Sequence, residues 1–175
     1  MVMLISIGFL LGRRPVEVFA IFLISFGIWD IFYYVFLKCL ISWPSSFLTW
    51  DILFLIPVLW VGPVIAPILN SLVMVALGYL ILLFSGRNVN PNLSKTEWIF
   101  LIGGAALVYI SYTEEFTRYL RDHLPAEGIR QLSTRFIPQY YRWWLFLSGF
   151  FLHIAAIIHY TVRIRRLTRS ILSPP

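Results

Sequence analysis

Long apolar stretches constrain this chain more than any other feature of its sequence. Of its 175 residues, 59% are hydrophobic and only 13% are charged, against roughly 25% charged residues in soluble domains. A bilayer core about 30 Å thick requires roughly 20 apolar residues for each helical crossing. The sequence therefore predicts an all-α, polytopic helical membrane protein with a single membrane domain over residues 1–175.

We expect four transmembrane helices, over residues 16–37, 63–84, 97–113 and 140–162. Pro15 stands where proline commonly opens a helix. Residues 1–11 are apolar but too short to cross a bilayer, because eleven helical residues extend only about 16 Å. We expect this segment to be half a helix that packs against a partner, or the end of a helix that starts upstream.

Prolines interrupt the apolar stretch that runs from Trp50 to Phe84. This stretch barely holds two crossings, and no polar turn divides it. We predict a half-helix over residues 50–61, with Asp51 in its first turn, followed by the crossing over 63–84. The half-helix is re-entrant, interfacial or spanning, and irregular backbone at this depth requires cover by protein or by a wet cavity.

Arginine and lysine side chains predict the orientation of the chain. Placing the basic tail, residues 163–175, in the cytoplasm puts eight cations there and six outside. The positive-inside rule therefore predicts a cytoplasmic C-terminus. The net charge of +6 follows from these flanking cations, so we expect the lipid bilayer, and not nucleic acid, as the partner of the basic residues.

The helical pattern of the third crossing continues into residues 114–137, which we expect to form an amphipathic connection on the outer surface. Its charged side chains form a candidate outer docking face for a soluble partner, made of Glu114, Glu115, Arg118 and Arg121. The alternative is a solvated face of ion pairs, because Glu114 and Arg118 have the favourable i, i+4 spacing.

Two ionisable residues lie at membrane depth, where burial of polar groups is costly and commonly marks function. Asp30 and His153 are placed in the first and last crossings, at depths that differ by about 4 to 5 Å. If these helices touch, the two side chains form a candidate intramembrane polar pair. The pair serves proton relay or substrate binding, or else it is a structural hydrogen bond that locks two helices.

The sequence predicts no metal site and no cofactor. Cys39 is the only cysteine, which excludes an internal disulfide and a cysteine-based metal cluster. His153 and His159 face different ways on their helix and cannot chelate one ion. An alternative is a haem or chlorophyll bound through His153 alone, with Gly149 leaving room for the flat ring.

Small residues occupy one patch of the third crossing, where another helix can approach closely: Gly103, Gly104, Ala105 and Ala106. Ser94 and Glu97, ahead of that patch, have the spacing of a helix-capping box. We therefore expect this helix to start near residue 97 and to pack tightly on a neighbour.

The segments Trp29–Tyr34 (WDIFYY) and Thr49–Pro57 (TWDILFLIP) resemble segments of small bacterial membrane proteins. The resemblance covers the first third to half of the chain and carries no activity or ligand with it. It implies a bacterial cytoplasmic (inner) membrane as the location.

The sequence holds no glycine-rich phosphate loop, HExxH pair or nucleophile elbow. This favours a non-catalytic subunit of a larger membrane complex, with a structural, assembly or docking role and other membrane subunits as partners. One alternative is a small transporter or membrane-embedded enzyme centred on Asp30 and His153. The other is a subunit that binds a tetrapyrrole through a single histidine.

Overall fold

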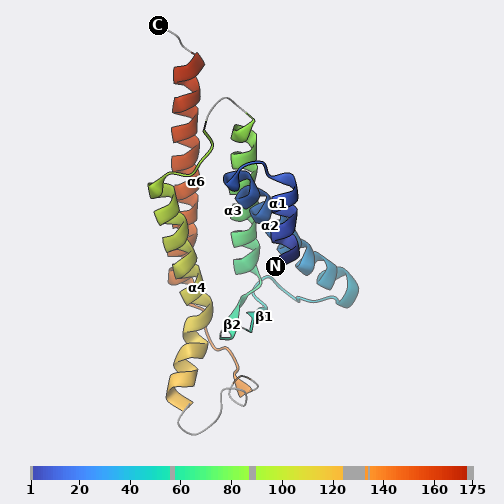
Figure 1. Ribbon diagram of the computed structural model, residues 1–175. Helices are drawn as coiled ribbons and strands as arrows, with labels where there is room; N and C mark the ends of the chain where they lie inside the picture. Colours follow the sequence, from blue (N-terminus) through green and yellow to red (C-terminus); the bar gives the residue numbers. More distant parts are fainter. Residues whose placement is uncertain (1, 56–57, 87–89, 124–132, 134, 173–175) are drawn as a thin grey trace.

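The computed structural model describes residues 2–55, 58–86, 90–123, 133 and 135–172. Its elements in chain order are α1 (Val2–Leu11), α2 (Pro15–Ile41), β1 (Trp50–Phe54), β2 (Trp60–Pro63), α3 (Ile65–Ser85), α4 (Lys95–His123) and α6 (Trp143–Leu172). Figure 1 shows α2, α3, α4 and α6 running in alternating directions, with the two strands below α3.

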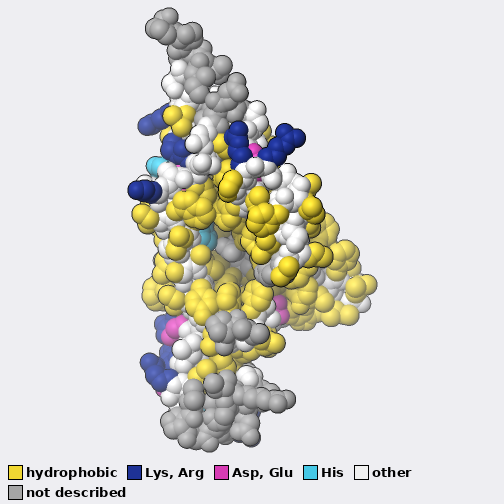
Figure 2. Space-filling view, viewed as in Figure 1, with side chains coloured by type: hydrophobic (Ala, Val, Ile, Leu, Met, Phe, Trp, Pro, Cys, Tyr) yellow, Lys and Arg dark blue, Asp and Glu magenta, His cyan; other side chains and the backbone are white. Residues whose placement is uncertain are grey.

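Among the described residues, four helices are long and apolar enough to cross a membrane: α2, α3, α4 and α6. This confirms the predicted all-α polytopic fold with four candidate spans. Hydrophobic side chains form a broad band in Figure 2, and lysine and arginine side chains lie above and below it. Such a distribution is typical of a membrane protein with an aqueous interface at each end.

The third and fourth helices extend beyond the predicted crossings, and for the third this agrees with the helical pattern that the sequence shows after residue 113. Helix α4 continues to His123, because the acid–base pair Glu114–Arg118 supports helix beyond the apolar segment. Helix α6 continues through the arginines of the basic tail to Leu172. Most of the amphipathic piece expected after α4 lies outside the described residues, as do residues 173–175.

The half-helix predicted over residues 50–61 is wrong. Strands β1 and β2 pair there in an antiparallel hairpin, with Trp50 opposite Pro63 and Asp51 opposite Gly62. The base of the hairpin is closed by hydrogen bonds from the amides of Val64 and Ile65 to the carbonyl oxygens of Thr49 and Phe47, 3.0 and 2.9 Å long.

A proline and backbone pairing explain why the described part of this segment is not helical. Pro63 lacks an N–H group and disfavours helical backbone at the residue before it. A helix of only twelve residues would also leave the polar groups of its first and last turns without partners. A hairpin pairs backbone groups of one strand with those of the other, which satisfies the demand for paired backbone within an apolar layer.

The four long helices pack as two pairs. Helix α2 lies along α3 and α4 along α6, whereas α3 contacts α6 less extensively. At one end a buried core joins α2, α3 and α6, made of Val16, Ala20, Leu23, Leu77, Ile81, Phe84, Tyr160 and Ile164. At the other end the hairpin region packs on α4 through Leu59, Val61, Phe116 and Leu120. The candidate site lies between these two cores.

Helix α1 packs against α2 of the same chain. Its Leu4 and Gly8 are buried, whereas Val2 and Leu10 are 80% and 83% exposed. The segment that the sequence predicted to be half a helix is therefore a ten-residue helix with one face on α2 and a wide apolar face uncovered.

Candidate functional site

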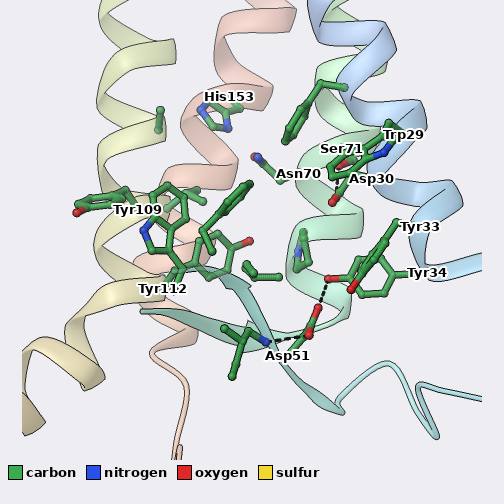
Figure 3. Close-up of a pocket in the computed structure, with 18 residues that line it drawn as sticks. Trp29, Asp30, Tyr33, Tyr34, Asp51, Asn70, Ser71, Tyr109, Tyr112 and His153 are labelled. Carbon is green, nitrogen blue, oxygen red and sulfur yellow. Dashed lines mark hydrogen bonds between the residues drawn. The ribbon is translucent and has the colours of Figure 1, made fainter. Parts of the chain in front are cut away.

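A cavity of about 390 Å³ lies between the two helix pairs, with the hairpin as its floor (Figure 3). All four long helices and both strands contribute to its walls. Its polar side chains are Asp30, Asp51, Asn70, Ser71 and His153, and its aromatic side chains are Phe26, Trp29, Tyr33, Tyr34, Phe54, Trp60, Tyr109 and Tyr112. The cavity thus combines carboxylates with a largely aromatic lining.

Asp30 projects from α2 and accepts a hydrogen bond of 2.7 Å from the Ser71 hydroxyl on α3. The two helices approach closely here, because a Cβ added at Gly27 would lie only 2.7 Å from the carbonyl oxygen of Ser71. Gly27 precedes Asp30 by about one helical turn and so permits this approach. The carboxylate is held at the cavity wall by a neutral donor.

Asp51 projects from β1 and approaches the cavity from below Asp30 (Figure 3). One of its carboxylate oxygens accepts a hydrogen bond of 2.8 Å from the Tyr34 hydroxyl. The other accepts one of 2.8 Å from the backbone amide of Ile52. Across the described part of the chain, no ion pair involves Asp30 or Asp51. Two carboxylates therefore border one cavity, each held by neutral donors.

His153 lies on the opposite wall from Asp30 (Figure 3). Its Nε2 donates to the carbonyl oxygen of Leu101 on α4 over 3.2 Å. The two residues line the same cavity but have different hydrogen-bond partners, and their helices, α2 and α6, make no close backbone approach among the described residues. Helix α3 lies between those two helices, so the direct contact on which an Asp30–His153 pair depends is not made.

Three buried polar atoms at the cavity have no hydrogen-bond partner among the described residues. They are the indole nitrogen of Trp60, the side-chain oxygen of Asn70 and the hydroxyl of Tyr112. All three residues line the cavity. Because buried polar groups in proteins are nearly always hydrogen-bonded to protein, water or ligand, these atoms are available to bind water or a polar group of a ligand in the cavity.

An apolar groove of about 280 Å³ adjoins the cavity and shares Asn70, Ala105 and His153 with it. The rest of its lining is hydrophobic and comes from α2, α3 and α4: Phe19, Leu23, Val73, Met74, Leu77, Trp98, Leu101 and Ile102. The cavity and the groove together offer a polar chamber with an apolar extension.

The small-residue patch of α4 divides into parts with different surroundings. A Cβ added at Gly104 would lie 2.8 Å from the carbonyl oxygen of Gly149, whereas one added at Gly103 would meet only Leu152, at 3.8 Å. Ala105 and Ala106 are both exposed, but of the two only Ala105 lines the cavity. The space expected beside Gly149 for a flat ring is filled by α4. Binding of a tetrapyrrole to His153 stays a prediction.

The four residues proposed as an outer docking face contact the chain itself. The Glu114 carboxylate accepts hydrogen bonds from Arg118 at 3.0 Å and from Arg142 at 2.5 Å. The same carboxylate raises the pKa of Arg142. Glu115 accepts hydrogen bonds from the backbone amides of Gln139 and Tyr140. Arg121 lies 3.8 Å from Asp122 on the exposed surface. The contacts of Glu114 with Arg142 and of Glu115 with the two amides fasten the segment before α6 to α4.

Sequence reasoning missed an ion pair at the opposite end of α4. Glu97 is fully buried and binds Arg163 through two bonds of 2.8 Å. The Nδ1 atom of His159 lies 2.9 Å from the same carboxylate. Glu97 also accepts from the Ser94 amide at 2.7 Å, as the capping-box spacing predicts. The sequence signal that could have predicted this ion pair is that Glu97 and Arg163 both stand at the inner ends of predicted helices.

Ser71 and Tyr34 were missed as partners of the two carboxylates, because a hydroxyl within an apolar helix has no characteristic spacing.

Comparison of the chain with known protein families, with characterised proteins and with solved structures finds no match.

Proposed function

We propose that this chain is a small integral membrane protein of the transporter class, which binds a solute in the cavity between its two helix pairs. The observation that carries the proposal is the presence of Asp30 and Asp51 at one cavity, each bound to neutral donors. Ionisable residues within membrane-spanning segments are costly and commonly mark substrate or ion pathways.

The arrangement of the helices supports transport. The cavity lies on the seam between the α2–α3 and α4–α6 pairs, which pack more extensively within than between themselves. Carriers commonly bind their solutes near the midplane, beside interrupted helical segments, and expose the site by rocking one bundle against another. Here the hairpin interrupts the helical course between α2 and α3.

We further propose a bacterial cytoplasmic membrane as the location, with the C-terminus inside. The C-terminal part of α6, which holds its arginines, lies at the upper end in Figure 1 together with the start of α4, where Lys95 stands, and the connection between α1 and α2, which holds Arg13 and Arg14. This grouping supports the orientation that the positive-inside rule gives.

Solute access is tested by cysteine reactivity at neighbouring positions. In a Cys39→Ser background, Ala105→Cys places a thiol in the cavity and Ala106→Cys places one on the exposed surface of α4 outside that cavity. In nanodiscs, we expect methyl methanethiosulfonate to modify Ala105→Cys at least about tenfold faster, because the reactive thiolate forms in water and not in lipid. Equal rates would contradict a solute-accessible cavity.

Transport is tested by the sidedness of the same reaction. Right-side-out and inverted membrane vesicles are treated with an impermeant methanethiosulfonate carrying a trimethylammonium group. A carrier exposes Ala105→Cys to both sides in turn, so we expect modification in both kinds of vesicle. Modification from one side alone would leave a binding protein and overturn transport.

The second candidate function is a non-catalytic subunit of a larger membrane complex. The observation that favours it is the uncovered apolar face of α1, a helix too short to cross a bilayer. Extraction in mild detergent followed by native mass measurement is then expected to find this chain bound to other membrane proteins. A monomer that retains solute binding would exclude this role.

A further inference from the structure

This inference rests on the proposed function and concerns the chemistry of the solute. We propose that the cavity binds an amphiphilic organic cation, with its ammonium group between Asp30 and Asp51 and its apolar tail in the adjoining groove. Charge, aromatic lining and shape each support this class of ligand.

The charge of the site favours a cation. Asp30 and Asp51 border the same cavity, and the described residues supply them with hydroxyl and amide donors but with no basic side chain. Burial of an ionised carboxylate is costly unless it is paired. A positively charged ligand placed between the two side chains pairs with both of them, and charge-assisted hydrogen bonds are stronger than neutral ones.

The aromatic lining favours an organic cation over a hydrated inorganic ion. Trp60 packs edge-on against Tyr109, with ring centroids 4.9 Å apart, and Trp29 stacks on Tyr33 at 6.2 Å. All four residues line the cavity. Aromatic faces attract ammonium groups through the ring quadrupole and bury the attached carbon atoms at the same time.

The shape of the site favours a ligand with a tail. The groove beyond Asn70, Ala105 and His153 is lined by hydrophobic side chains of three helices. A compact polar cation would leave this groove empty, whereas an alkyl chain fills it and removes apolar surface from water. The unpartnered side-chain oxygen of Asn70 lies where the two spaces meet, and it can accept a hydrogen bond from the ligand.

Protection of the cavity thiol tests the proposal with defined probes. The Ala105→Cys protein in nanodiscs is treated with methyl methanethiosulfonate in the presence of octylammonium, ethylammonium, octanoate or sodium ion. We expect octylammonium to slow modification, ethylammonium to require at least about tenfold higher concentration for the same effect, and octanoate and sodium to give no protection.

Variants of the two carboxylates connect any protection to the proposed contacts. Asp30→Asn and Asp51→Asn are each expected to weaken protection by octylammonium at least about tenfold, which corresponds to the loss of a charge-assisted contact. Asp122→Asn changes an exposed carboxylate at the far end of α4 and is expected to leave protection unchanged. Because the two aspartates lie on different elements, a folding defect in one variant does not prevent the test in the other.

The outcomes separate this inference from the proposed function. Protection by octanoate or by sodium equal to that by octylammonium would overturn the assignment of an organic cation. Protection by ethylammonium at the same concentration as octylammonium would overturn the tail. Rapid modification of Ala105→Cys that no probe slows would refute this inference and leave the accessible cavity standing, whereas slow modification without any probe refutes the proposed function itself.

Discussion

Gly104 and Gly149 bring α4 and α6 into backbone contact, since a Cβ added at Gly149 would lie only 2.6 Å from the carbonyl oxygen of Gly104. The ring of His153 covers the same spot, with its Nε2 2.7 Å from the place of a Cβ on Gly104. The contact that joins the two helices therefore also places His153 in the cavity wall.

Gly104→Ala is expected to destabilise the protein, because the added methyl group meets backbone and ring atoms that cannot move away freely. Overpacking of this kind costs about 1–3 kcal/mol. The matched control is Gly103→Ala, whose Cβ meets only Leu152 at ordinary contact distance and should be neutral or stabilise the helix by up to about 1 kcal/mol. Thermal unfolding in detergent, followed by circular dichroism, compares the two, and equal melting temperatures would contradict the close contact.

Glu97→Gln is expected to lower stability by about 1–3 kcal/mol, below the full cost of breaking a buried ion pair because Arg163 is 26% exposed. The change removes the negative charge of the carboxylate to which Arg163 donates two hydrogen bonds. Asp122→Asn breaks an exposed pair with Arg121 and should alter stability by less than about 0.5 kcal/mol. Melting temperatures of both variants decide the matter; a Glu97 variant as stable as the Asp122 variant would show that the buried pair contributes nothing.

Glu115→Ala is expected to speed hydrogen exchange at the amides of Gln139 and Tyr140, which both donate to its carboxylate. Loss of about 1 kcal/mol of hydrogen bonding corresponds to roughly fivefold faster exchange. Mass spectrometry of the protein in nanodiscs measures this. Peptides from the middle of α6 serve as the internal control, and unchanged exchange at residues 139 and 140 would show that Glu115 does not hold this segment.

Cys39 allows the orientation to be tested with the native cysteine, because it is exposed near the end of α2. In intact cells we expect an impermeant maleimide to label it from outside. A Ser170→Cys variant in the Cys39→Ser background should be labelled only after the membrane is made permeable, since residue 170 lies at the basic end of α6. The opposite pattern would invert the topology.

The four long helices were predictable because their signal is local: about 20 apolar residues in a row leave little choice but a helical crossing. Asp30 was identified for the same reason, as a charge within such a run. The hairpin was not, because Asp51 after Thr49 also has the pattern of a helix start, and pairing between Trp50 and Pro63 is not encoded by either residue alone.

The partners of the charged residues were the least predictable part of the site. Asp30 binds Ser71 and not His153 because α3, and not α6, lies along α2 with its backbone close by. The neighbour and the rotation of a helix depend on the packing of the whole bundle, as the Gly27–Ser71 contact illustrates. A sequence gives the depth of a polar residue from its position, but depth alone does not identify the residue across from it.

The apolar rim of the chamber has a consequence for the route that a ligand takes. Its exposed side chains include Trp29, 49% exposed, and Ile52, 56% exposed. A molecule already dissolved in one leaflet can therefore enter the chamber laterally, between the helices. Its occupancy then follows its partitioning into lipid, so membranes of different composition change the apparent affinity without altering a single contact.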